Sequence, residues 1–268
     1  MMYSNKCDGV VGGDKQLIYV ASKLLEKAKK SDSTFSIFFV SQMTKEDVIR
    51  GSRELEHMVD GVFTLTMEDE SGTLRMLRCN KNRFGDVSEV GLFQMTEEGL
   101  CEISDPNKYF ITSRILPVYG SAVTTIKEGA RTIALEINTL SEDNSFSYPT
   151  RISQGISKDF LQIILAVLGN KILPVIKRKD IYLQTSNGLV IKDTSVGLGI
   201  AASVYSSIKK LPIKNDCVFI GEISLTGEIK KVPYIDKIIN DLQRMGFNTV
   251  VIPVGNTIKK HPGIKIIE

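Results

Sequence analysis

Apolar and polar positions follow one another along the chain with periods that predict both helices and strands. One helical stripe predicts a helix over 15–30, with Asp14 as its N-cap; its members are Leu17, Val20, Ala21, Leu24, Leu25 and Ala28. The almost wholly apolar run FSIFFV at 35–40 predicts a strand buried on both faces, followed by the polar stretch SQMTKE. In open α/β sheets, ligands bind at that end of a strand.

The segment up to residue 96 predicts one short helix and three strands. The helix is expected over 52–60, a hairpin over 61–68 and 73–79 around the turn sequence DESG, and a further strand over 91–96. The polar loop KNRFGDVSEV connects the hairpin to the last strand. A stretch with two prolines and no strong period follows, so we place a domain boundary near Pro117.

The second half of the chain begins a new series of strands and helices. A hairpin is expected over 121–138 with its turn at Glu128 and Gly129, and Ser157 is expected to cap a helix that runs to Gly169. Further strands are expected at 180–186, 216–225 and 249–254, and further helices at about 195–209 and 234–245. Gly197 and Gly199 inside one of these helices allow close packing. The pattern predicts an α/β protein with two domains.

Composition narrows the class of protein without naming a function. The chain has 268 residues, a formal net charge of +3, 42% hydrophobic and 24% charged residues, which is ordinary globular usage. Four scattered cysteines without a C-x-x-C pair, together with two histidines, argue against a zinc site and favour a reducing cytoplasm. Neither a signal peptide nor a bilayer-spanning stretch is evident, so we expect a cytoplasmic protein without a membrane partner.

Positive charge is concentrated in one place. The run from Ser71 to Gly85 contains no acidic residue and holds four cations, which are Arg75, Arg78, Lys81 and Arg83. Arginine can fork onto phosphate oxygens and lysine adds a point charge, whereas the neighbouring Phe84 can anchor the loop or stack. We expect Gly85 to take a positive φ. On spacing alone, a solvated basic hairpin end explains the run better than a binding site does.

Other candidates carry competing explanations. Gln42, Thr44 and Lys45 follow the strand expected at 35–40, where they either meet a ligand or cap the next helix. Arg75 and Arg78 either contact phosphate groups of a ligand or face solvent. The adjacent pair Glu56 and His57 has no further ligands at a suitable spacing, so we expect a helix-surface pair and not a metal site.

Three ordered blocks carry a family resemblance. LEHMVD, KNRFG and FQMTEEGL occur in this order within residues 55–100, and GSAVTTIKEGART and VFIGEISLTGEIKKVP continue the pattern. The chain resembles bacterial RadA (Sms) proteins, which are RecA-related DNA repair proteins. The resemblance implies that residues 1–117 correspond to the C-terminal half of a RecA-like ATPase core and residues 118–268 to a Lon-protease-like α/β domain.

The resemblance also implies roles for the candidate residues. Lys81 and Arg83 of the KNRFG motif are expected to act in trans on the nucleotide of a neighbouring protomer in a hexameric ring. Gln42 and Lys45 are expected to sense nucleotide or face DNA, and DNA binding is expected of Arg75, Arg78, Lys81 and Arg83. The implied ligands are ATP with Mg²⁺ and single-stranded or branched DNA, and a recombinase is a possible partner.

The sequence departs from the RadA pattern in ways that bear on activity. It contains no G-x-x-x-x-G-K-[ST] loop, no Walker B strand and no four-cysteine zinc finger, so we expect a truncated RadA that does not hydrolyse ATP alone. Counting along the Lon-like blocks places Val196 and Asp236 where a Lon protease carries its serine and lysine. Ser195 and Lys237 are each one residue away, which turns a helical side chain by about 100°. We therefore expect no catalytic dyad.

These observations leave three hypotheses. The first is a DNA repair and recombination protein that processes recombination intermediates, by ATP-dependent branch migration in the full-length family. The second is a non-catalytic remnant that oligomerises or binds DNA. The third is a Lon-like serine peptidase.

Overall fold

A computed structural model describes residues 3–30, 34–41, 52–144, 148–256 and 258–268 of the chain. The chain forms two compact units: residues 1–64 with 78–87, and residues 65–77 with 88–268. Two strands, β1 (Gly61–Met67) and β2 (Leu74–Asn82), each contribute residues to both units.

The first unit contains α1 (Asp14–Ala28) and α2 (Ser52–Met58). α1 confirms the predicted helix, but Gly13 and not Asp14 is its N-cap residue. Asp14 lies in the first turn, where a negative charge interacts favourably with the helix dipole. The buried amide of Gln16 accepts from the Ser4 backbone N at 2.8 Å and donates to the Ser4 carbonyl at 3.1 Å, so the N-terminal segment is held against α1.

The strand predicted over 35–40 is wrong. These residues have no regular secondary structure, and Phe38 and Val40 are 90% and 98% exposed. A strand needs a neighbour to satisfy its backbone donors and acceptors, and no strand in the described part of the chain pairs with this segment. The composition of this apolar run is typical of a strand, but the described part of the chain provides no neighbouring strand to pair with it.

A four-stranded sheet has the order β1-β2-β3-β4, with β3 at Val90–Thr96 and β4 at Gly99–Glu102. β1 and β2 are neighbours joined by a short turn, which confirms the predicted hairpin. Val62 and Thr64 of β1 are buried while Phe63 and Leu65 are exposed, as the two-residue period of a strand requires. The strand β4 has no counterpart among the predicted elements.

Asp69 fixes the turn of this hairpin. Its Oδ2 accepts from the Thr73 backbone N at 3.2 Å, from the Thr73 hydroxyl at 2.8 Å and from the Ser71 hydroxyl, and its Oδ1 accepts from the Leu74 backbone N at 3.0 Å. Burial would raise the pKa of Asp69, but these hydrogen bonds outweigh it and leave the pKa below its usual value.

The second unit also holds a seven-stranded mixed sheet in the order β13-β12-β9-β5-β6-β8-β7. The strands are β5 (Ser121–Glu128), β6 (Arg131–Asp143), β7 (Arg151–Gln154), β8 (Lys179–Thr185), β9 (Cys217–Phe219), β12 (Thr249–Val251) and β13 (Lys265–Ile267). Four neighbouring pairs are parallel, and β6 is antiparallel to both of its neighbours. Glu128 is the last residue of β5 and is opposite Arg131, so the predicted hairpin is confirmed, with Gly129 and Ala130 in its turn, one position after the predicted pair.

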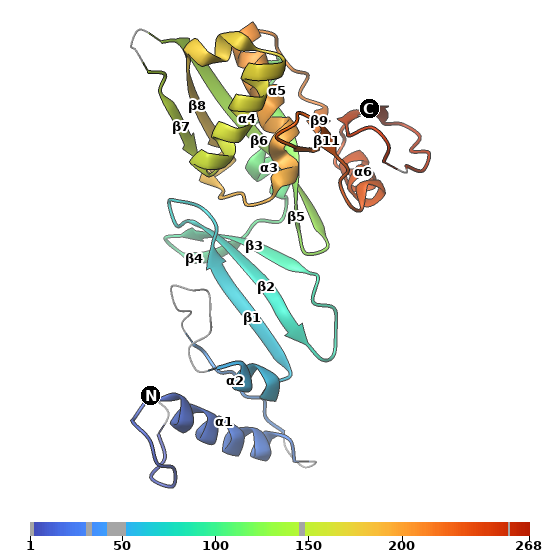
Figure 1. Ribbon diagram of the computed structural model, residues 1–268. Helices are drawn as coiled ribbons and strands as arrows, with labels where there is room; N and C mark the ends of the chain where they lie inside the picture. The colour runs from blue at the N-terminus through green and yellow to red at the C-terminus, as the bar shows by residue number, and fades with distance from the viewer. Residues whose placement is uncertain (1–2, 31–33, 42–51, 145–147, 257) are drawn as a thin grey trace. The chain divides into compact units, whose positions relative to one another are not determined.

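Two helices, α4 (Lys158–Lys171) and α5 (Gly197–Lys209), lie side by side and pack against this sheet (Figure 1). The Ser157 hydroxyl accepts from the Phe160 backbone N at 3.2 Å, which confirms the predicted cap of α4. A Cβ atom on Gly199 would lie 2.7 Å from the Thr124 Cβ, so the glycine allows α5 to approach β5 closely. This confirms the predicted role of glycine in close packing.

A second apolar cluster involves α6 (Ile235–Arg244), whose buried face is formed by Ile235, Ile238, Ile239 and Leu242. These side chains share a core with Val218 of β9 and Val250 of β12. The remaining elements are the helix α3 (Pro106–Phe110), the strands β10 (Glu222–Ile223) and β11 (Ile229–Lys230), and short 3-10 helices at Pro174–Arg178, Ser186–Gly188 and Thr194–Val196.

A buried ion pair attaches the segment after α3 to β6. Glu136 Oε1 accepts from Arg114 Nη1 and Oε2 from Arg114 Nη2, both at 2.8 Å, and Oε1 also accepts from the Thr112 backbone N at 3.1 Å. The Glu136 side chain is 2% exposed and that of Arg114 is 21% exposed. The Asn215 side chain donates to the Arg114 carbonyl at 3.0 Å, so this segment is fixed at several points.

The α/β class predicted from the sequence is confirmed, with parallel pairs in the majority in the central sheet. The domain boundary near Pro117 stays a prediction. Within the described ranges, every helix is too short or too polar to cross a membrane.

Candidate functional site

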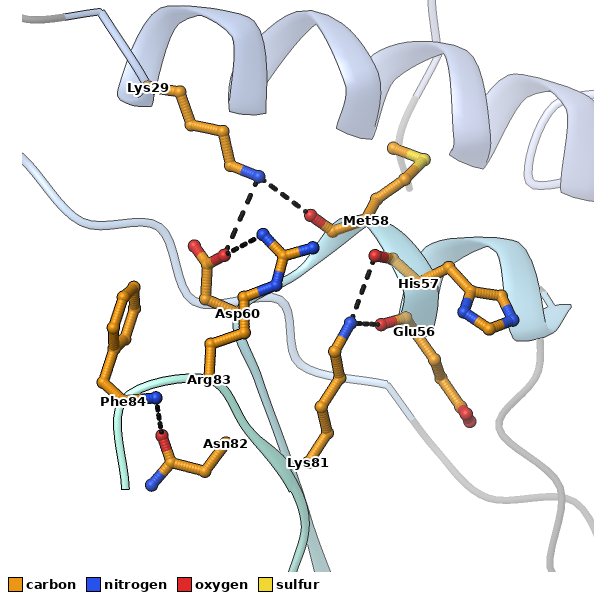
Figure 2. A network of polar contacts seen from close by, with 9 residues as sticks. All are labelled: Lys29, Glu56, His57, Met58, Asp60, Lys81, Asn82, Arg83 and Phe84. Atoms are coloured by element: carbon orange, nitrogen blue, oxygen red, sulfur yellow. Dashed lines mark hydrogen bonds and ion pairs between the residues drawn. The ribbon is translucent and has the colours of Figure 1, made fainter. Parts of the chain in front are cut away.

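The KNRFG sequence, residues 81–85, begins inside β2 and ends in the loop that follows. β2 extends to Asn82, three residues beyond the predicted strand end, so Lys81 is a strand residue and Arg83 is the first residue after the strand. The Arg83 backbone N donates to the Asp60 carbonyl at 2.9 Å. The strand therefore places the Lys81 and Arg83 side chains beside the C-terminal end of α2 (Figure 2).

Lysine ammonium groups bind the last carbonyls of α2. Lys81 Nζ donates to the Glu56 carbonyl at 2.7 Å and to the His57 carbonyl at 3.1 Å, and Lys29 Nζ donates to the Met58 carbonyl at 3.2 Å (Figure 2). The final carbonyls of a helix have no partner within the helix and carry its partial negative charge. Two lysines from outside α2 thus satisfy that end of the helix.

A single oxygen of Asp60 accepts a hydrogen bond from Arg83 and forms a longer ion pair with Lys29. Arg83 Nη1 lies 3.1 Å from Asp60 Oδ1, and Lys29 Nζ lies 3.8 Å from the same oxygen (Figure 2). The side chains of Arg83, Lys29 and Asp60 are 52%, 48% and 37% exposed. Ion pairs with this exposure contribute about 0–1 kcal/mol each, because water and salt screen them.

The rest of the motif differs in part from expectation. Phe84 is 86% exposed, so it does not anchor the loop, and its ring is accessible for stacking. The Phe84 backbone N donates to Asn82 Oδ1 at 3.1 Å, which holds the turn. The positive φ expected of Gly85 is wrong, because this glycine is outside the left-handed region. A Cβ there would lie 2.9 Å from Asn82 Nδ2, so the close approach of that amide explains the glycine.

The two other arginines of the basic run lie in different units. Arg75 belongs to the second unit, where its Nη1 donates to the Gly72 carbonyl and, at 3.5 Å, to the Leu74 carbonyl. Arg78 belongs to the first unit and is half-buried with contacts of its own. DNA contact by Arg75 and Arg78 stays a prediction.

Gln42, Thr44 and Lys45 lie outside the described residues, so their predicted role in nucleotide sensing or DNA contact stays a prediction. Glu56 and His57 take part in the site through their carbonyl oxygens, which accept from Lys81. The described residues contain no group of three or more His, Cys, Asp and Glu side chains that could hold a metal ion.

The Lon-like positions fall in the second unit. Val196 is fully buried in the core, and Asp236 accepts from His261 Nε2 at 2.8 Å, a hydrogen bond that lowers the pKa of Asp236. The Ser195 backbone N is capped by Asp193 Oδ1 at 2.9 Å, while Lys237 lines a cavity of about 850 Å³ with Asp241. Among the described residues, no hydrogen bond joins Ser195 to Lys237.

Sequence reasoning missed Lys29 and Asp60. Lys29 follows α1 and belongs to no motif, whereas Asp60 follows α2 and ends the LEHMVD block, which does not indicate any partner for its carboxylate. A count of charges near helix ends identifies Lys29 as a cation in a last turn, but nothing in the sequence pairs it with Asp60. Only the packing of β2 beside α2 shows that Lys29 and Asp60 interact with each other and with the KNRFG residues.

The fold defines an α/β protein with a mixed central sheet and a cationic strand end. Residues 170–256 match the family described as subunit ChlI of Mg-chelatase. This match covers β8, α5, β9, α6 and β12, and therefore falls wholly in the half of the chain expected to form the second domain.

Relatives cover almost the whole chain. It is 34% identical over 268 residues to DNA repair protein RadA of Bacillus subtilis, covering 99% of the chain and 58% of the relative. The RadA protein of Helicobacter pylori strain 26695 is 36% identical over 252 residues, with coverages of 94% and 55%, and that of Pseudomonas aeruginosa is 35% identical over 267 residues, with coverages of 99% and 58%.

The resemblance to RadA drawn from the sequence blocks is confirmed: the chain is a relative of the RadA proteins along nearly its whole length. It spans a little over half of the length of the relatives it matches.

Proposed function

We propose that the chain acts in DNA repair and recombination by binding the phosphate backbone of DNA through Lys81 and Arg83. The observation that carries this proposal is 34–36% identity to proteins named DNA repair protein RadA over nearly the whole chain. The chain spans only 55–58% of the length of these relatives. The proposal is therefore limited first to DNA contact. Processing of recombination intermediates by branch migration is the finer form of the proposal.

The chemistry of the loop supports phosphate as the ligand. The run from Ser71 to Gly85 has no acidic residue, and the exposed Phe84 ring offers a surface on which an unpaired base can stack. Phosphate contacts position a protein on DNA without reading its sequence, and they weaken steeply with salt. We therefore expect binding to single-stranded or branched DNA without strong sequence preference.

ATP and Mg²⁺ are implied by the RadA relationship, but the residues present do not fit them. The sequence has no glycine-rich phosphate loop, and no carboxylate cluster among the described residues suits a magnesium ion. We assign no ATP-dependent step to the chain. Action of Lys81 and Arg83 on a nucleotide held by a second protein, a hexameric ring and a recombinase partner remain further parts of the hypothesis.

Titration with labelled DNA tests the proposal. Fluorescence anisotropy with a single-stranded oligonucleotide, at about 50 mM and about 200 mM salt, gives both affinity and salt dependence. Lys81→Ala and Arg83→Ala should each weaken binding and reduce the slope of log affinity against log salt by about 0.7. The matched control is Lys23→Ala, since Lys23 is an exposed lysine of α1 in the same unit, paired with Glu26.

Two results would contradict DNA contact by these residues. One is an affinity that does not change with salt. The other is a Lys81→Ala, Arg83→Ala double variant that binds as well as the unmodified chain does. A branch-migration assay on a synthetic Holliday junction, with and without ATP, tests the finer form separately.

A further inference from the structure

The cationic groups of the KNRFG loop already have oxygen partners within the first unit. Arg83 donates to the Asp60 carboxylate and Lys81 donates to two carbonyls of α2, while Lys29 contacts both Asp60 and the end of α2. Figure 2 shows all three cationic groups directed toward the C-terminal end of α2. A phosphate that binds Arg83 must therefore compete with an internal acceptor.

Asp60 is the partner whose chemistry matches phosphate. Its Oδ1 presents one anionic oxygen to both an arginine and a lysine, as a phosphate oxygen does in a basic site. The carbonyls that accept from Lys81 are neutral and belong to the end of α2. The hydrogen bonds to them stabilise the helix end and do not imitate a phosphate contact. Of the two motif cations, Arg83 is the one that an internal anion holds.

We propose that Asp60 holds Arg83 in a closed state and that DNA phosphate opens this state by taking the place of Asp60 on the guanidinium. This inference rests on the proposed function, because it assumes that Arg83 binds phosphate. Lys29 has a distinct part in the open state: it already contacts Asp60 Oδ1, so the carboxylate keeps a cation when Arg83 leaves.

The exposure of the ion pair makes the exchange feasible. Arg83 is half-exposed and Asp60 more than one-third exposed, so water reaches both groups and neither is desolvated when they separate. Exposed pairs are weak, so the closed state reduces phosphate affinity by a factor of about 2–5. Asp60 therefore modulates DNA affinity without abolishing binding.

Asp60→Asn tests the proposal, because asparagine keeps the shape of the side chain and removes its charge. It also retains the Asp60 carbonyl that accepts from the Arg83 backbone N. The Asn variant should bind a labelled single-stranded oligonucleotide about 2–5 times more tightly than the unmodified chain, measured by anisotropy. Inorganic tripolyphosphate, used as a competitor of the oligonucleotide, should likewise bind the Asn variant more tightly than the unmodified chain. The exchange involves phosphate and not bases.

A double-variant cycle separates release of Arg83 from simple loss of a repelling charge. Asp60→Asn is measured alone and in the Arg83→Ala background, and the gain should vanish when Arg83 is absent. Glu26→Gln is the control for charge, since Glu26 lies in the same unit and pairs with Lys23 instead. Its effect on affinity should be smaller than that of Asp60→Asn.

The outcomes distinguish this inference from the proposed function. If Arg83→Ala binds DNA as the unmodified chain does, the proposed function fails and the closed state has no role. If Arg83→Ala weakens binding but Asp60→Asn does not strengthen it, only the closed state is refuted. An equal gain from Asp60→Asn with and without Arg83 also refutes it, because charge removal then explains the gain.

A measurement on the unmodified chain covers the case in which Asp60→Asn disturbs folding. NMR of the arginine side chains should show the Arg83 Nε–Hε signal shifting on addition of the oligonucleotide, with the Asp60 carboxyl signal shifting at the same DNA concentrations. A shift of Arg83 without any change at Asp60 would overturn the exchange.

Discussion

Replacing Arg114 by methionine should strongly destabilise the second unit. Arg114→Met removes both guanidinium hydrogen bonds to Glu136 and leaves a carboxylate that is 2% exposed with only the Thr112 backbone N among the donors described above. A buried charge without its counterion is costly, because the surrounding protein cannot replace the water that it lost on folding. The cost arises from the carboxylate left behind more than from the arginine removed.

The magnitude follows from the burial of the two partners. Breaking a buried ion pair by removing one member costs about 3–5 kcal/mol. The Arg114 side chain is 21% exposed, so water can approach the vacated space and the lower end, about 3 kcal/mol, applies. The free energy of unfolding of a whole domain is about 5–15 kcal/mol, so this change removes a large part of the stability.

Urea denaturation followed by circular dichroism measures the effect. With a urea slope near 3 kcal/mol per M, a loss of about 3 kcal/mol lowers the unfolding midpoint by about 1 M. The control is the double variant Arg114→Met, Glu136→Met, in which an apolar pair replaces the charged one. Such replacements are often neutral or stabilising, so the double variant should regain most of the lost stability.

Either of two results would refute the reasoning. A loss below about 1 kcal/mol for Arg114→Met would mean that Glu136 finds another donor or water, so that the pair is not buried in the way described. A double variant no more stable than Arg114→Met would mean that packing of the arginine chain, and not the unpaired carboxylate, causes the loss.

Three further predictions concern particular side chains. Asp69→Asn should lower stability at neutral pH by about 1–3 kcal/mol. The folded-state pKa of Asp69 is depressed. The difference in unfolding free energy between the variant and the unmodified chain should therefore shrink as the pH falls below the ordinary pKa of 3.8. Denaturation at several pH values measures this difference. Burial, together with nearby Asp216, raises the pKa of Cys217 to about 11, so at pH 8 it should react with a thiol reagent far more slowly than exposed Cys101, measured by mass spectrometry of labelled peptides. Gly120→Ala should destabilise by more than about 1 kcal/mol in a thermal melt, because φ is +79° and the new Cβ would lie 2.3 Å from the Thr139 carbonyl oxygen.

Each of these has a clear contrary result. An unchanged acid-side profile for Asp69→Asn would show that the turn does not depend on the carboxylate. Equal labelling rates for the two cysteines would contradict burial of Cys217, and an unshifted melting temperature would mean that the backbone at Gly120 relaxes without cost.

Local sequence was sufficient for most helices and for the hairpins. Ser157 identified the start of α4 correctly, because a hydroxyl cap acts on backbone groups only three residues away. The hairpin between β5 and β6 was also predicted, with its turn within one residue of the observed one, since a two-residue hairpin turn depends on its own backbone. The run at 35–40 failed because strand formation depends on a partner that composition does not specify.

For the candidate site, the sequence identified the cations and their concentration in one loop, because charge and spacing are properties of the chain itself. Tertiary structure alone decided which oxygens those cations meet. Lys29, Asp60 and Arg83 are separated by more than twenty residues at each step, and only the packing of β2 beside α2 brings them together. Electrostatic partnership depends on distances of a few ångströms in space, which the order of residues along the chain does not fix.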